Sequence, residues 1–304
     1  MPDPSSTMAA APTSPSQRNL DPVALDVLCR RFGGPVPWLH QEVAQRMAAR
    51  LAIVKARPSR ILNWWAQQGG GHELLRRHAP RAQIQAVETR AVLQRQADES
   101  PWWQRWRPGR SAALADDAVP ARSAQLLWSN MMLHWAADPV EVMRRWYEAL
   151  EVDGFVMFSC FGPDTLREVR TVFQRDAYGP AGVDFVDMHD LGDMLVHAGF
   201  ADPVVMDMET LTLTWDSSER MLAELRSLGR NIHPQRFAGL RTPRWRERWL
   251  TGLPRGEDGR WALSFEIVYG HAFKPAARVK VAAQAQVSLD DMRAMVRRAR
   301  PLGR

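Results

Sequence analysis

Short apolar runs alternate with amphipathic helical patterns through the first half of the chain. The apolar runs have strand length and end at polar or glycine-containing turns; they cover residues 61–65, 84–87, 125–130 and 155–158. The helical patterns cover about residues 22–32, 38–55, 72–78, 89–97 and 138–150. Strands that alternate with helices are typical of a parallel sheet with helices on both faces. The pattern predicts an α/β fold of the Rossmann-like, doubly wound kind.

The pattern changes after residue 175. A helix at about 188–198 is followed by a long alternating strand at 203–215, and a second long strand begins at Trp261. Between these strands lie two further helical patterns, at 217–228 and 243–250. Long strands after a parallel core predict a late antiparallel strand, and the helices between them predict a helical cap inserted at about residues 217–255.

The two ends of the chain differ from this core. Residues 1–19 are rich in Pro, Ser and Ala and have no apolar pattern, which predicts a disordered tail. Ser288-Leu289-Asp290-Asp291 has the form of a helix start and predicts a C-terminal helix within 281–304. The single domain is therefore expected over residues 20–280.

Composition is that of an ordinary globular protein. The 304 residues are 45% hydrophobic and 24% charged, and no run of 18 apolar residues suggests a membrane span. Cys29 and Cys160 have neither metal-binding nor redox spacing, so we expect free thiols in a reducing compartment, the cytoplasm.

The net charge of +6 comes almost entirely from arginine. A basic surface could attract nucleic acid, an acidic carrier protein or an anionic thioester, and it could equally be a solvated arginine-rich surface. The aromatic and basic stretch Trp102–Trp106 is the only further feature that favours nucleic acid. We therefore expect no nucleic-acid partner.

A cofactor site is predicted where the first two strands end. The order strand, glycine-rich turn, helix, strand and acid is a βαβ unit, with Gly69, Gly70 and Gly71 in the turn and Glu88 at the end of the second strand. An acid about twenty residues past the glycines is the interval at which a ribose is bound in such units. The alternative is an ordinary solvated carboxylate at a strand end.

Several segments resemble one enzyme family. They are Ser129-Asn130-Met131-Met132-Leu133-His134-Trp135, Phe161-Gly162-Pro163-Asp164-Thr165-Leu166, 185–193, 225–231 and 265–272. The chain resembles the BioC family, the malonyl-acyl carrier protein O-methyltransferases, over about residues 25–275. Related assembly factors of respiratory complex I share some of these segments.

The resemblance implies a class I methyltransferase fold, S-adenosylmethionine as cofactor and a malonyl thioester, carried on acyl carrier protein, as substrate in biotin synthesis. By the same resemblance the cofactor-binding residues are Gly69, Glu88, Asn130 and an acid near the third strand, Asp117 or its neighbour Asp116. The implied substrate-side residues are Trp135, Phe161, Gly162, Asp164 and Tyr269.

The glycine-rich turn departs from the family. Where the family has an Asp-Leu-Gly-Cys-Gly-Thr-Gly pattern, this chain has Asn63-Trp64-Trp65-Ala66-Gln67-Gln68-Gly69, so Trp65 and Gln67 add bulk where a backbone must approach the cofactor closely. Two hypotheses follow: a methyltransferase similar to BioC, or a non-methylating relative that kept the fold and acts as an interaction or assembly protein or an altered enzyme.

No catalytic residue and no metal site are predicted. A carboxylate nucleophile is already ionised at neutral pH, so positioning and desolvation suffice and no general base is needed. Asp187, His189, Asp190 and Asp193 favour helix capping and charge pairing over metal binding. We expect Asn130, Phe161, Gly162, Asp164 and Tyr269 to meet in one cleft, because parallel strands end at one edge of a sheet.

Overall fold

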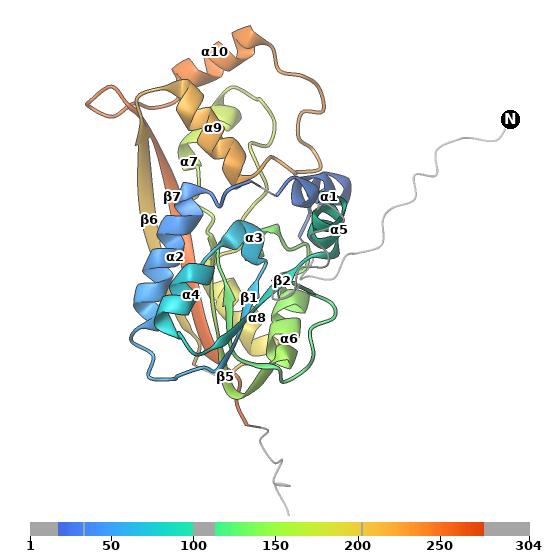
Figure 1. The fold of residues 1–304 in the computed structure, drawn as a ribbon. Helices are drawn as coiled ribbons and strands as arrows, with labels where there is room; N and C mark the ends of the chain where they lie inside the picture. Colours follow the sequence, from blue (N-terminus) through green and yellow to red (C-terminus); the bar gives the residue numbers. More distant parts are fainter. Residues whose placement is uncertain (1–17, 33, 100–112, 202, 277–304) are drawn as a thin grey trace, which may run out of the picture. The chain divides into compact units, whose positions relative to one another are not determined.

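The computed structural model describes residues 18–32, 34–99, 113–201 and 203–276. Most of the predicted tail at 1–19, the aromatic stretch at 102–106 and the helix expected within 281–304 lie outside these residues. The compact unit that carries the sheet extends to Lys274, and Figure 1 shows its elements.

One sheet runs through the whole unit. Its strands are β1 (Arg60–Trp64), β2 (Gln83–Glu88), β3 (Leu114–Ala115), β4 (Ala124–Ser129), β5 (Leu150–Phe161), β6 (Val205–Trp215) and β7 (Trp261–Phe273). They lie in the order β3-β2-β1-β4-β5-β7-β6. β7 is antiparallel to both of its neighbours, and the pairs among β1 to β5 are parallel. The predicted fold, a mostly parallel sheet with a late antiparallel strand, is confirmed.

Helices begin where local signals place them. They are α1 (Pro22–Arg31), α2 (Trp38–Leu51), α3 (Ala66–Gly69), α4 (His72–His78), α5 (Arg90–Glu99), the 3-10 turn η2 (Leu133–Trp135), α6 (Pro139–Ala149), α7 (Arg167–Arg175), α8 (Met188–His197), α9 (Ser218–Leu228) and α10 (Pro243–Gly252). Side-chain caps that accept backbone N–H bonds precede five of them: Asp21, Asp138, Asp187, Ser217 and Thr242. Asp187 therefore serves as the cap of α8.

Alternation along the strands divides the core between the two faces of the sheet. Leu62 and Trp64 of β1 pack with α6 and α8, whereas Ile61 packs with α2 and α4. In β4, Leu127 belongs to the first cluster and Leu126 to the second. This period of two buries both faces and fixes the strand register, since a slip of one residue would exchange the two sets.

Two features differ from the sequence-based expectation. The short strand β3 was not predicted; it pairs Ala115 with Glu88 and so brings the next residue, Asp116, beside the end of β2. The sequence also predicts a helix start with Asp164 or Thr165 as its cap, whereas α7 begins at Arg167, after Leu166, without a side-chain cap. The Thr165 hydroxyl is instead bonded to the backbone of Glu266 on β7, so it is not free to cap a helix.

Candidate functional site

Two cavities lie at the carboxyl ends of the parallel strands. The first, of about 260 Å³, is called the acidic cavity after Glu88 and Asp116, which line it. The second, of about 520 Å³, is called the aromatic cavity; it is lined by Phe161, by α7 and by the helices α9 and α10. Trp135 lines both cavities and so forms part of the boundary of each. A ligand site at strand ends is the rule for open α/β sheets.

The acidic cavity is built from the turns after β1, β2, β3 and β4, with α1 contributing to its wall. Trp65 follows β1, Thr89 follows β2, and Met132 comes from the segment after β4. From α1, Leu25 and Cys29 face the cavity. Because four consecutive strand ends contribute, the cavity occupies the position predicted for a nucleotide-like ligand.

The carboxylate of Glu88 is almost fully removed from water. Glu88 is only 4% exposed, and its carboxylate accepts a hydrogen bond from the backbone N–H of Gln67 at 2.6 Å. Burial, helped by the nearby charge of Asp116, raises the pKa of Glu88 to about 7. Burial also raises the pKa of Asp116, whose carboxylate accepts the indole N–H of Trp65 at 3.0 Å. A pair of desolvated acids favours a ligand that donates hydrogen bonds or carries positive charge.

We expect Glu88 to make the stability of the protein depend on pH. Its folded pKa of about 7 lies above the ordinary value of 4.5, so the folded state binds the extra proton between those values. The resulting stability is present below pH about 4.5 and is lost as pH rises through 7. Between pH 5 and pH 8 the free energy of unfolding of the wild type should therefore fall by on the order of 3 kcal/mol more than that of Glu88→Gln. Urea unfolding of both proteins at the two pH values measures this difference.

A matched variant controls this experiment. Asp117→Asn alters an exposed acid whose pKa is lowered by its bond to Arg90, so it should leave the change between pH 5 and pH 8 as it is in the wild type. Parallel stability curves for the wild type and Glu88→Gln would show that Glu88 does not carry the extra proton.

The predicted cofactor residues Gly69, Asn130 and Asp117 do not line the acidic cavity. The Asn130 amide donates to the carbonyls of Gly69 and His40, at 2.6 and 2.8 Å, and its oxygen accepts from Ser159 at 2.8 Å. A Cβ on Gly69 would lie 2.5 Å from the Asn130 carbonyl oxygen. These residues hold the turn after β1 against β4 and β5. Asp117 is exposed and pairs with Arg90, so Asp116 is the acid that faces the cavity.

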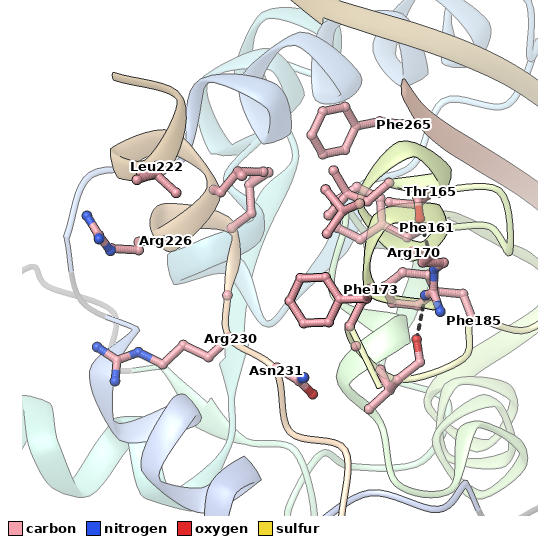
Figure 2. Close-up of a pocket in the computed structure, with 18 of the residues that line it drawn as sticks. Phe161, Thr165, Arg170, Phe173, Phe185, Leu222, Arg226, Arg230, Asn231 and Phe265 are labelled. Carbon is pink, nitrogen blue, oxygen red and sulfur yellow. Dashed lines mark hydrogen bonds between the residues drawn. The ribbon is translucent and has the colours of Figure 1, made fainter. Parts of the chain in front are cut away.

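The aromatic cavity has apolar walls and a cationic edge. Its larger side chains come from the end of β5, from α7, from β7 and from the inserted helices, and include Phe161, Phe173, Phe185, Trp245, Trp249 and Phe265. Three arginines line it as well: Arg170, Arg226 and Arg230. Figure 2 shows Arg226 and Arg230 on the α9 side, with their guanidinium groups turned outward, and Arg170 on the opposite side of the cavity.

The three arginines differ in what they can still bind. Arg170 donates to the carbonyls of Val183 and Thr165, at 2.7 and 3.2 Å, so its donors are largely used within the protein. Arg226 and Arg230 are exposed, and no hydrogen bond or ion pair joins either guanidinium to another residue in the described part of the chain. A free guanidinium at the edge of an apolar cavity suits a carboxylate or phosphate.

Of the predicted substrate-side residues, Trp135 and Phe161 line the aromatic cavity and Gly162, Asp164 and Tyr269 do not. A Cβ on Gly162 would lie 2.4 Å from a carboxylate oxygen of Glu266, which also accepts the backbone N–H of Asp164 at 2.9 Å. The Asp164 side chain is exposed. The turn after β5 therefore packs against Glu266 on β7, and the expectation that Gly162 and Asp164 join Phe161 in one cleft is corrected.

Tyr269 lies away from the predicted cleft. Its hydroxyl donates to Glu209 on β6 at 2.6 Å, and the guanidinium of Arg50 lies 3.9 Å from the centre of its ring. β7 runs antiparallel to β5, so Tyr269 pairs with Ser159 while Ile267 pairs with Phe161 at the strand end. The expectation that Tyr269 joins the cleft is thus wrong, because each step along β7 leads away from that edge.

Sequence reasoning also missed Glu266, Arg226 and Arg230. Glu266 could have been noticed, since it is a lone acid inside the apolar run of β7. No local signal separates Arg226 and Arg230 from the many other arginines.

Comparison with known proteins identifies the family. No model of a known protein family matches the chain. It is 38% identical over 256 residues to the malonyl-[acyl-carrier protein] O-methyltransferase of Gallionella capsiferriformans, which covers 79% of this chain and 86% of that relative. The relatives of the same name in Laribacter hongkongensis and Legionella pneumophila are 36% and 32% identical and are covered over 84% and 86% of their length. The chain belongs to the malonyl-[acyl-carrier protein] O-methyltransferase family. The predicted resemblance is confirmed.

Among solved structures, YcgJ of Bacillus subtilis is similar at a TM-score of 0.47 and 12% identity, over 78% of this chain and 100% of that one.

Family membership allows the acidic cavity to be compared with the cofactor that the resemblance implies. S-adenosylmethionine carries a ribose diol and an adenine amine, and the carboxylates of Glu88 and Asp116 are of the right type to accept from both. The cavity is small for this cofactor, since its volume of about 260 Å³ lies below the usual range of small-molecule sites, which begins at ~300 Å³. The side chain of Trp65, only 8% exposed, takes up part of the space.

Among the described residues, no group of three or more His, Cys, Asp or Glu is arranged to hold a metal ion. None of their helices combines the length and apolar character of a membrane span.

Proposed function

We propose that the chain transfers a methyl group from S-adenosylmethionine to the free carboxylate of a malonyl thioester carried on acyl carrier protein, in biotin synthesis. Family membership over most of the chain is the observation that carries this proposal. The acidic cavity is assigned to the cofactor and the aromatic cavity to the acyl thioester. Their shared wall at Trp135 supports this division, because donor and acceptor must meet at one point.

The residues of the aromatic cavity suit the acceptor. A malonyl carboxylate is ionised at neutral pH, so it needs no base and must only be held and stripped of water. Arg226 and Arg230, whose guanidinium groups have no partner among the described residues, can hold a carboxylate through two parallel bonds. The phenylalanine and tryptophan walls exclude water from the acyl part. We assign α9 and α10, within the insertion at about 217–255 of the domain at 20–280, to the role of a substrate-side cap.

The acidic cavity supplies the second half of the site. S-adenosylmethionine, when bound, provides a methyl group on a sulfonium sulfur. Glu88 and Asp116 would accept hydrogen bonds from its ribose and adenine, and Met132 and Trp135 would lie against its apolar parts. The buried acids also favour the positive charge of the cofactor over the neutral product.

We place this reaction in the cytoplasm. Cys29 and Cys160 are both free thiols, the state that a reducing compartment maintains. An acyl carrier protein is the proposed partner because the relatives carry it in their name.

The test uses the purified full-length protein with S-adenosylmethionine and three acyl carrier protein thioesters. Malonyl-acyl carrier protein should gain one methyl group by mass spectrometry, because it alone presents a free carboxylate. Acetyl-acyl carrier protein and the monomethyl ester of malonyl-acyl carrier protein should remain unchanged. Absence of the methyl ester under conditions where S-adenosylhomocysteine binds would contradict the proposal.

A second function has one observation in its favour. Trp65 and Gln67 already donate hydrogen bonds to Asp116 and Glu88, which is what a non-methylating relative with an obstructed cofactor site would show. Such a protein would act as an interaction or assembly factor. It would bind neither S-adenosylmethionine nor S-adenosylhomocysteine in calorimetry, whereas the methyltransferase binds both.

A further inference from the structure

The turn that follows β1 lines the acidic cavity and donates hydrogen bonds to two of its acids. The indole N–H of Trp65 donates to Asp116 at 3.0 Å, and the backbone N–H of Gln67 donates to Glu88 at 2.6 Å. Glu88 and Asp116, two of the acids that line the cavity, are therefore both bonded by residues of one turn. No acid–arginine pair competes for them, since within the described residues neither Glu88 nor Asp116 forms a salt bridge.

The groups of this turn match those of an adenosine in shape and chemistry. An indole is a flat aromatic ring with an N–H donor, as an adenine is a flat ring with an amine donor. The N–H of Gln67 gives Glu88 one bond of the kind that a ribose hydroxyl gives. The turn thus supplies to each carboxylate what the cofactor would supply.

The turn is held in an unfavourable backbone conformation. Trp65 has φ +52° and ψ +49°, the left-handed region that residues with a Cβ rarely adopt. Such a conformation persists only where its surroundings enforce it. Here the N–H of Trp65 donates to the Val87 carbonyl at 2.7 Å, and the side chain of Gln67 accepts from Gln96 of α5 at 2.5 Å. These contacts fix Trp65 over the acids.

We infer that Trp65 is a built-in substitute for the adenosine of the cofactor, which must leave Asp116 before S-adenosylmethionine can bind and which therefore sets the affinity of this site. The inference rests on the proposed function, because it concerns the cofactor of that reaction. By this inference, the departure from the family's glycine-rich turn has a definite effect: the turn competes with the cofactor for Glu88 and Asp116.

The test is binding of S-adenosylhomocysteine by isothermal titration calorimetry to the wild type and to Trp65→Gly and Trp65→Phe. Glycine accepts the left-handed conformation and frees the space, so Trp65→Gly should bind at least about tenfold more tightly than the wild type. Phenylalanine keeps most of the bulk without the N–H donor, so Trp65→Phe should fall between the two. Trp38→Phe, which alters an exposed tryptophan outside the acidic cavity, should bind as the wild type does.

A second measurement does not depend on how well Trp65→Gly folds. The indole N–H resonance of Trp65 in the wild type, assigned by its absence from the spectrum of Trp65→Phe, should shift when S-adenosylhomocysteine is added. Binding that leaves this resonance unmoved, or a folded Trp65→Gly that binds no more tightly, overturns the inference. If neither the wild type nor any folded Trp65 variant binds, the inference is also wrong, since Trp65 is then not what excludes the ligand.

Methyl transfer measured in the same preparations separates this inference from the proposed function. If the wild type transfers the methyl group but its Trp65 resonance does not shift when the ligand binds, the proposed function holds and the inference is wrong. Tighter binding by Trp65→Gly without methyl transfer by any variant keeps the inference and removes the function.

Discussion

Replacing Arg226 and Arg230 together by alanine is expected to raise KM for malonyl-acyl carrier protein by about 10²- to 10⁴-fold. Each guanidinium would contribute hydrogen bonds to a charged group, worth about 1.5–3 kcal/mol apiece. The malonyl carboxylate loses its charge as its oxygen bonds to the methyl carbon, so an arginine holds the substrate more tightly than the transition state. The loss should therefore appear in KM, with kcat unchanged or raised. Steady-state kinetics of ester formation measures both.

Two controls make the arginine experiment specific. Arg244→Ala removes an exposed arginine of α10 that does not line the aromatic cavity, and it should leave KM unchanged. The methyl ester product lacks the carboxylate, so the double variant should bind it as well as the wild type does. An unchanged KM in the double variant, or an equal loss of affinity for the ester, would show that these arginines do not hold the carboxylate.

Gly229→Ala should lower the free energy of unfolding by roughly 2–6 kcal/mol and impair methyl transfer. Gly229 follows α9 with φ +150°, and a Cβ there would lie 2.3 Å from the ring of Trp135. The substitution combines backbone strain with displacement of the side chain that lines both cavities. Urea unfolding measures the first effect, and the malonyl assay measures the second.

A neighbouring glycine provides the matched control. Gly182 lines the same aromatic cavity, but a Cβ on it would meet no atom within 4 Å, so Gly182→Ala should be tolerated. Combining Gly229→Ala with Trp135→Phe should recover part of the lost stability, because the smaller ring gives way. Equal destabilisation by the two glycine variants would mean that contact with Trp135 is not the cause.

Features that depend on neighbouring residues in the chain were predictable from the sequence. Helices were expected at about 22–32 and 217–228, and they begin directly after the side-chain caps Asp21 and Ser217, since capping needs only the next few residues. The buried runs that became β1 and β4 were recognised for the same reason. The mostly parallel sheet with a late antiparallel strand was predicted as well, whereas the order of the strands was not.

The site depended on tertiary contacts that periodicity does not report. Asp116 and Asp117 are adjacent, and only the pairing of β3 with β2 decides that Asp116 faces the acidic cavity. The sequence suggested that Gly162 lies beside the substrate, but in the structure it packs closely against Glu266 of β7. The bulk of Trp65 was visible in the sequence, but its bond to Asp116 joins residues 51 positions apart.

The most direct test of the account is a crystal structure of the full chain with S-adenosylhomocysteine and the malonyl thioester of pantetheine. We predict the ribose on Glu88, the adenine near Asp116 with Trp65 displaced, and the malonyl carboxylate between the aromatic walls within reach of Arg226 or Arg230. The sulfur should face the carboxylate beside Trp135. S-adenosylhomocysteine bound in the aromatic cavity, or a malonyl group remote from Trp135, would contradict the assignment of the two cavities.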